Sequence, residues 1–275
     1  MPIVSIQNLL LRSLVMGSKL GFILYLSLVS DELLIQWGLL SVTVVYFVLV
    51  IGLDLYMPYN RLVMRERDGQ KINEILTEQF NAYGSIYKVI LIPFVVILGY
   101  INFYYLFIIP LLFFEHISHE AYRILNSIKE PLLASIALNI KYSIWMMSII
   151  ILDYSSIYQV NFGSIMVLYV VSSFISFVFS RKCIDKKISI STNLLYYLAR
   201  GKGSIFQIVK KKTGLFFIST LIFSGILVLD RYYLEFIDSV YLADYILISS
   251  IVFGILNSID PLFISTKLPQ FVQRI

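Results

Sequence analysis

Both histidines of the chain lie in one short segment with two glutamates, in the order Glu115-His116-Ile117-Ser118-His119-Glu120. Side chains three or four residues apart share a helix face, so His116, His119 and Glu120 have a spacing that can hold zinc. Zinc proteases use H-E-x-x-H or H-x-x-E-H, whereas the order here is H-x-x-H-E. Elsewhere the sequence offers one further soft ligand, Cys183. We therefore expect no metal, no cofactor and no enzyme activity, and interpret the segment as a span end where Glu120 pairs with Arg123.

Three basic residues lie inside stretches that are otherwise apolar: Arg12, Lys19 and Lys141. A charge at the centre of a bilayer costs about 3 kcal/mol or more. Arg12 and Lys19 are seven residues apart and share one helix face, and Arg12 is also placed to anchor at the membrane surface. Lys19 and Lys141 lie near the middle of their stretches, so we expect them to line a polar cavity. Asp54 is expected to pair with a neighbouring cation such as Lys19 or Arg61.

The elements that must position these residues are membrane-spanning helices. The chain is 59% hydrophobic and 14% charged, with a mean hydropathy of +0.83, whereas soluble domains are about 45–50% apolar and 25% charged. The apolar run 86–120 would be too long for one span, so we split it near Tyr100-Ile101-Asn102. The sequence then predicts an all-α, polytopic membrane bundle of about eight spans, near 10–29, 38–57, 86–102, 103–120, 132–152, 160–180, 213–230 and 241–261.

The net charge of +5 reflects membrane orientation rather than a nucleic-acid partner. With a cytoplasmic N-terminus, the inner segments hold 18 of the 22 basic residues and the outer loops hold one, Arg231. This asymmetry follows the positive-inside rule and predicts that both termini are cytoplasmic. Nine of the basic residues lie in 181–212. We therefore expect a six-helix lobe at 1–180, a basic cytoplasmic connector at 181–212, and a partial second lobe of two helices at 213–275.

Several stretches, spread over nearly the whole chain, carry a resemblance to a known transporter family. They are Lys19-Leu20-Gly21-Phe22, Trp37-Gly38-Leu39, Ile51-Gly52-Leu53-Asp54, Leu112 to Arg123, Pro131-Leu132-Leu133-Ala134-Ser135 with Trp145, and Leu229-Asp230-Arg231-Tyr232-Tyr233-Leu234. In these stretches the chain resembles the polysaccharide (O-antigen and capsule) flippases of the multidrug/oligosaccharidyl-lipid/polysaccharide exporter superfamily. The resemblance implies a multi-pass protein of the bacterial cytoplasmic membrane that transports polyprenyl-diphosphate-linked oligosaccharide by alternating access.

The resemblance also implies roles for individual residues and a partner. Arg12, Lys19 and Lys141 would contact the diphosphate, and Arg231 would serve an outer gate or pair with Asp230 or Glu235. Members of this family have 12 to 14 spans in two six-helix lobes, more than the eight expected here. A truncated or split form, or a second chain or copy that completes the cavity, is therefore implied. The alternative functions are a non-transporting scaffold of a glycan-assembly complex and, ranked third, a membrane-embedded enzyme.

Overall fold

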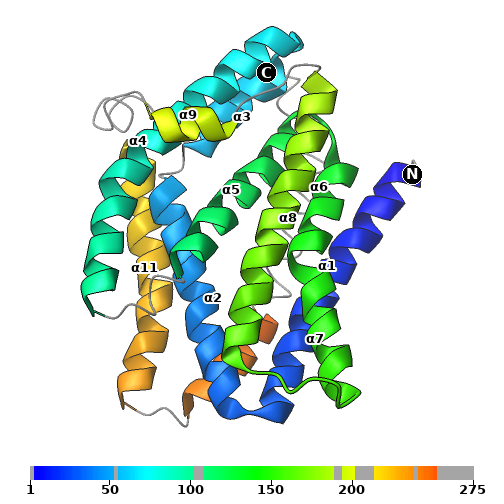
Figure 1. Cartoon of the computed structure of the whole chain (residues 1–275), viewed down its shortest axis with the longest axis vertical. Helices are drawn as coiled ribbons and strands as arrows, with labels where there is room; N and C mark the ends of the chain where they lie inside the picture. The colour runs from blue at the N-terminus through cyan, green and yellow to red at the C-terminus, as the bar shows by residue number, and fades with distance from the viewer. Residues whose placement is uncertain are drawn as a thin grey trace.

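The computed structural model describes residues 3–52, 55–101, 108–188, 194–201, 214–237 and 241–252, and within these ranges it contains helices and no β-strand. The helices in chain order are α1 (Ile3–Val29), α2 (Asp31–Gly52), α3 (Tyr56–Arg65), α4 (Gly69–Ile101), α5 (Ile108–Ser127), α6 (Pro131–Leu138), the π-helix η2 (Asn139–Ser143), α7 (Ile144–Tyr154), α8 (Phe162–Ile188), α9 (Leu194–Arg200), α11 (Gly214–Ile237) and a helix at Tyr241–Val252. The predicted all-α bundle is confirmed (Figure 1).

Four helical stretches of the described residues are long and apolar enough to cross a membrane: Ile6–Val29, Asp31–Gly52, Pro131–Tyr154 and Phe162–Ile188. They correspond to the spans expected near 10–29, 38–57, 132–152 and 160–180. The chain is therefore a helical membrane protein. The total number of spans and the orientation of the termini stay predictions.

Three helices extend beyond the boundaries that hydropathy indicated. α8 continues past residue 180 to Ile188, where Arg181 and Asp185 pair one turn apart at 3.7 Å. α4 begins at Gly69, well before the expected span at 86–102, and forms one helix of 33 residues. α11 continues to Ile237, so Arg231 lies in a helix rather than in a loop. Hydropathy indicates where an apolar stretch of sequence ends. The helix itself continues for as long as its backbone hydrogen bonds do.

One end of the bundle is covered by α3, the first half of α4 and α9 (Figure 1). α9 lies very close to α4 because both contribute glycines: a Cβ on Gly84 would lie 2.1 Å from the carbonyl oxygen of Leu198. Gly201, which follows α9, has a φ of +47°, a conformation that favours glycine. The Lys88 ammonium donates to the carbonyl oxygen of Arg200 at 2.7 Å, a favourable position at a helix C-terminus. These contacts fasten α9 to α4.

The turn between α3 and α4 is closed by the Glu66 side chain. Its Oε1 accepts hydrogen bonds from the backbone N–H groups of Asp68, at 3.1 Å, and Arg67, at 2.9 Å. Both bonds favour the carboxylate and lower the pKa of Glu66 below its ordinary value. The turn therefore depends on an ionised Glu66.

Two apolar cores lie along the bundle and meet at α5. One includes Phe80 and Tyr83 of α4 together with Ile117 of α5, and the other includes Phe22 of α1 and Leu112 of α5. The polar residues 115 and 116 lie between these two sections of α5. The junction of the two cores therefore contains charged side chains. They lie away from both ends of the bundle and are not exposed to water.

Candidate functional site

A fully buried ion pair joins α5 to η2 in the middle of the bundle. The Lys141 ammonium lies 2.8 Å from Oε1 of Glu115, and the two side chains are 1% and 3% exposed. The same Oε1 accepts a hydrogen bond from the Tyr142 hydroxyl at 2.7 Å, and Oε2 accepts one from Ser173 of α8 at 3.1 Å. The Glu115 carboxylate is thus satisfied by three donors, as a buried charge requires.

Lys141 lies at the centre of the π-helical turn Asn139–Ser143, within the predicted span near 132–152. Such turns insert one extra residue into an α-helix and are frequent at functional sites. Side chains support the altered backbone: the Lys141 carbonyl oxygen accepts from Trp145 Nε1 at 2.8 Å and from Ser172 at 2.9 Å. The turn therefore fixes Lys141 as a bundle-facing residue in the interior.

Lys19 of α1 approaches the same site at the ring of Tyr142. Its ammonium lies 3.7 Å from the centroid of the Tyr142 ring, and the Lys141 ammonium lies 5.1 Å from the same centroid. Lys19 is exposed, yet it shares a helix face with the buried residues Val15 and Phe22. The opposite side of α1 presents exposed leucines, namely Leu14, Leu24 and Leu28. The structure thus brings Lys19 and Lys141, far apart in sequence, onto one aromatic ring.

Arg12 does not join this group. Its Nε donates to Ser135 of α6 at 3.2 Å, and its Nη2 donates to Asn126 of α5 at 3.5 Å. Two helical turns separate Arg12 from Lys19, a rise of about 10 Å. Arg12 therefore connects α1 to the α5–α6 junction, and its predicted contact with a diphosphate stays a prediction.

The predicted gating residues lie elsewhere. Arg231 of α11 donates to the carbonyl oxygen of Gly38 at 3.2 Å and to Ser249 at 3.3 Å, so it links α11 to α2 and to the helix Tyr241–Val252. Asp230 accepts a hydrogen bond from Tyr245. Arg231 and Asp230 thus have further partners, and the pairing of Arg231 with Asp230 or Glu235 stays a prediction. Asp54 lies outside the described residues.

The second glutamate of the 115–120 segment forms a separate cluster on another side of α5. Glu120 pairs with Arg123 at 2.6 Å, which confirms the predicted i,i+3 pair. The Glu120 carboxylate also accepts from Tyr83 at 2.7 Å and from Gln79 at 3.0 Å, both on α4. The Arg123 guanidinium lies over the ring of Tyr56 of α3 at 3.5 Å. This cluster holds α3, α4 and α5 together.

The two histidines contact aromatic rings. The His116 ring packs edge-on against Tyr83 and Tyr87, and its Nδ1 is within hydrogen-bond distance of the Tyr87 hydroxyl. The His119 ring packs against Tyr122. Among the described residues, no group of three or more His, Cys, Asp or Glu side chains is arranged to hold a metal ion.

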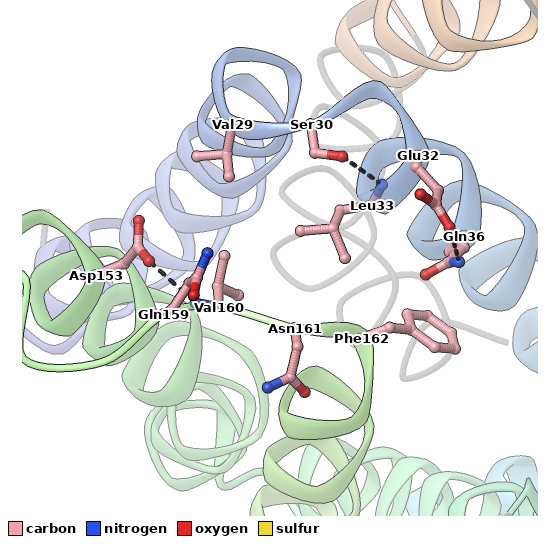
Figure 2. Close-up of a pocket in the computed structure, with 10 residues that line it drawn as sticks. All are labelled: Val29, Ser30, Glu32, Leu33, Gln36, Asp153, Gln159, Val160, Asn161 and Phe162. Carbon is pink, nitrogen blue, oxygen red and sulfur yellow. Dashed lines mark hydrogen bonds between the residues drawn. The ribbon is translucent and has the colours of Figure 1, made fainter.

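An open cavity of about 530 Å³ lies between the α1–α2 turn and the α7–α8 loop (Figure 2). It is lined by Val29, Ser30, Glu32, Leu33, Gln36, Asp153, Gln159, Val160, Asn161 and Phe162. Asp153 accepts a hydrogen bond from the backbone of Val160 at 3.0 Å, and Glu32 accepts one from Gln36 at 3.1 Å. The lining carries two carboxylates and no Lys or Arg, so its charge repels an anion. An anion-binding site therefore has to be sought at the lysines.

The fold and the ion pair of Lys141 with Glu115 define a class: a helical membrane protein with a buried, charged site between its helices. No protein-family model, no curated protein and no solved structure matches the chain. The resemblance to polysaccharide flippases accordingly stays a prediction from the sequence.

The partners that complete the site were not predicted from the sequence. Glu115 lies in the segment interpreted as a span end, and neither Tyr142 nor Ser173 is among the predicted site residues. One feature of the sequence did point to Glu115 as a partner of Lys141. A charge at Lys141 in the middle of the bilayer requires a counter-charge, and Glu115 is a carboxylate in a neighbouring predicted span. Contact between residues 26 positions apart still depends on how the helices pack.

Proposed function

We propose that this protein moves an anionic lipid-linked oligosaccharide, in which a polyprenyl diphosphate carries the glycan, across the bacterial cytoplasmic membrane. The observation that carries the proposal is the approach of both the Lys19 and the Lys141 ammonium groups to the ring of Tyr142, at 3.7 Å and 5.1 Å from its centroid. Two ammonium groups and the Glu115 carboxylate give the site a net charge of +1. In a low-dielectric interior this excess charge attracts an anion much more strongly than it would in water.

Burial distinguishes Lys141 from a lysine that merely anchors a helix. A long side chain near a helix end extends to the interface, and its charge stays in water. Lys141 is 1% exposed, and its ammonium donates to both Oε1 and the backbone carbonyl oxygen of Glu115. Ionisable residues inside membrane bundles mark substrate or ion pathways, and this supports a transport function.

The exposed side of Lys19 supports a partner. The Lys19 ammonium contacts the Tyr142 ring, yet Lys19 as a residue keeps an exposed surface. We propose that a second chain or a second copy of this protein covers that side and completes the cavity within the lipid bilayer. Native mass spectrometry from nanodiscs should then detect a dimer or a complex, and a purely monomeric protein would contradict this part of the proposal.

The test is a flipping assay with the full chain in proteoliposomes that carry a fluorescent polyprenyl-diphosphate oligosaccharide. Lys19→Glu and Lys141→Glu should each reduce the flipping rate at least tenfold, because reversal of charge repels the diphosphate. The control is Lys187→Glu, which reverses a lysine that is 54% exposed at the end of α8. Normal flipping by both Lys19 and Lys141 variants would refute the assigned site.

A genetic experiment tests the function in cells. Deletion of the gene should remove surface polysaccharide, and the lipid-linked precursor should accumulate on the inner leaflet. Normal surface polysaccharide in a strain without a redundant flippase would exclude the proposed transport.

A scaffold of a glycan-assembly complex is the second candidate, because the end of the bundle formed by α3, α4 and α8 carries exposed basic residues. They are Arg61, Arg65, Arg67, Lys71, Lys182, Lys186 and Lys187. Such a surface binds anionic lipids or an acidic peripheral glycosyltransferase. Co-purification with glycosyltransferases, combined with intact flipping after deletion, would favour the scaffold over the transporter.

A further inference from the structure

We propose that Glu115 is an internal counter-ion that competes with the anionic ligand for Lys141 and thereby sets which anions the site accepts. This inference rests on the proposed function and adds a specificity-determining residue to the same site. Its basis is the direct pairing of the two side chains at 2.8 Å, with both buried.

The Glu115 carboxylate occupies the position that a ligand oxygen would need. A phosphate oxygen and a carboxylate oxygen make the same kind of charge-assisted hydrogen bond to an ammonium group. Lys141 already donates to Oε1 and to the carbonyl oxygen of Glu115. A ligand must therefore displace Glu115 before it can contact Lys141, and Glu115 acts as a built-in competitor.

The other partners of Glu115 remain in place when Lys141 turns away from it. A displaced Glu115 keeps the hydrogen bonds from the Tyr142 and Ser173 hydroxyls, so its charge does not become bare. The lysine ammonium is carried on a flexible four-carbon stem.

Competition with a carboxylate predicts selectivity for ligands of higher charge. A ligand with one negative charge only replaces the charge that Glu115 already supplies, so it gains little binding free energy. A diphosphate carries at least two negative charges, so it can neutralise both Lys141 and Lys19 at once. The site should therefore prefer diphosphates to monophosphates and should discriminate against neutral lipids.

The two tryptophans of the chain provide a readout at the site. The ring centroids of Trp37 and Trp145 are 5.7 Å apart, and Trp145 Nε1 donates to the Lys141 carbonyl oxygen. Binding of farnesyl diphosphate, farnesyl monophosphate and farnesol to the purified full chain can be followed by intrinsic fluorescence in detergent micelles.

Glu115→Gln keeps the shape of the side chain and removes its charge. It should bind farnesyl diphosphate at least tenfold tighter than the wild type does, and it should also gain measurable affinity for the monophosphate. Glu115→Asp keeps the charge but shortens the side chain by one methylene. Its affinity for farnesyl diphosphate should therefore fall between the affinities of the wild type and of Glu115→Gln. If Glu115→Gln does not fold, the Glu115→Asp affinity decides, because wild-type or weaker affinity in that variant overturns the inference.

The matched control is Glu120→Gln, a neutralisation on the same helix whose partner is Arg123 rather than Lys141. It should leave the affinity for farnesyl diphosphate unchanged. If wild-type binding requires Lys141 but Glu115→Gln does not strengthen it, the inference fails and the proposed function stands. If neither the wild type nor Glu115→Gln binds the diphosphate, the proposed anionic cargo fails and the inference fails with it.

Discussion

Replacement of Lys141 by methionine removes the ammonium group and keeps most of the length of the side chain. The Glu115 carboxylate then stays buried without its ionic partner. Loss of one partner from a buried ion pair costs about 3–5 kcal/mol of stability, because the remaining charge cannot regain its hydration. Glu115 keeps the hydrogen bonds from Tyr142 and Ser173, and bonds to a charged group contribute about 1.5–3 kcal/mol each. We therefore expect a loss near the lower limit, about 3 kcal/mol.

The double variant Lys141→Met with Glu115→Gln isolates the ionic contribution. It contains no buried charge at this position, and such replacements are often neutral or stabilising. We expect the double variant to recover most of the stability that Lys141→Met loses. The coupling energy between the two positions should then be about 2 kcal/mol or more, within the range for directly contacting residues.

The assay is unfolding in mixed micelles with increasing SDS, followed by the fluorescence of Trp37 and Trp145. Both rings pack in the apolar core next to η2 and are 6% and 4% exposed, so unfolding changes their environment. The reasoning is refuted if Lys141→Met lies within 1 kcal/mol of the wild type. It is also refuted if the costs of the two single variants simply add in the double variant.

Three further substitutions test other parts of the structure. Gly84→Ala places a methyl group 2.1 Å from the carbonyl oxygen of Leu198, so α9 should detach and residues 194–200 should exchange amide hydrogens faster in mass spectrometry. Lys187→Ala removes a surface pair with Glu130, and its melting temperature should stay within about 2 °C of the wild type because such pairs contribute at most about 1 kcal/mol. Arg231→Met should loosen the packing of α11 against α2, detected as faster exchange in 214–237, whereas unchanged exchange there would show that its hydrogen bonds are dispensable.

Local features of the fold follow from the sequence because local spacing determines them. The pair Glu120–Arg123 is one helical turn apart, so helix geometry alone brings its members together. Four apolar stretches are helices of membrane-spanning length for the same reason, since composition and length are local properties.

Long-range features of the candidate site do not follow from the sequence. The contact of Lys19 with Tyr142 and the ion pair of Lys141 with Glu115 each join two helices that are far apart in the sequence, so both depend on how the helices pack. The π-helical turn at Asn139–Ser143 has no composition that distinguishes it from an α-helix. Periodicity can place a lysine in the interior of a span, but it cannot identify the side chain that neutralises the charge.

The two glutamates of the histidine-containing segment belong to different sites, and this can be measured. Glu115 and Glu120 are five residues apart, which places them about 140° apart around the helix axis. The partners of Glu115 lie on η2 and α8, whereas Glu120 binds α4 side chains and Arg123 of its own helix. The costs of Glu115→Gln and Glu120→Gln should therefore add to within about 0.5 kcal/mol in the double variant. A larger coupling would mean that α5 carries one connected polar centre, and the separation of ligand site from structural cluster would then be wrong.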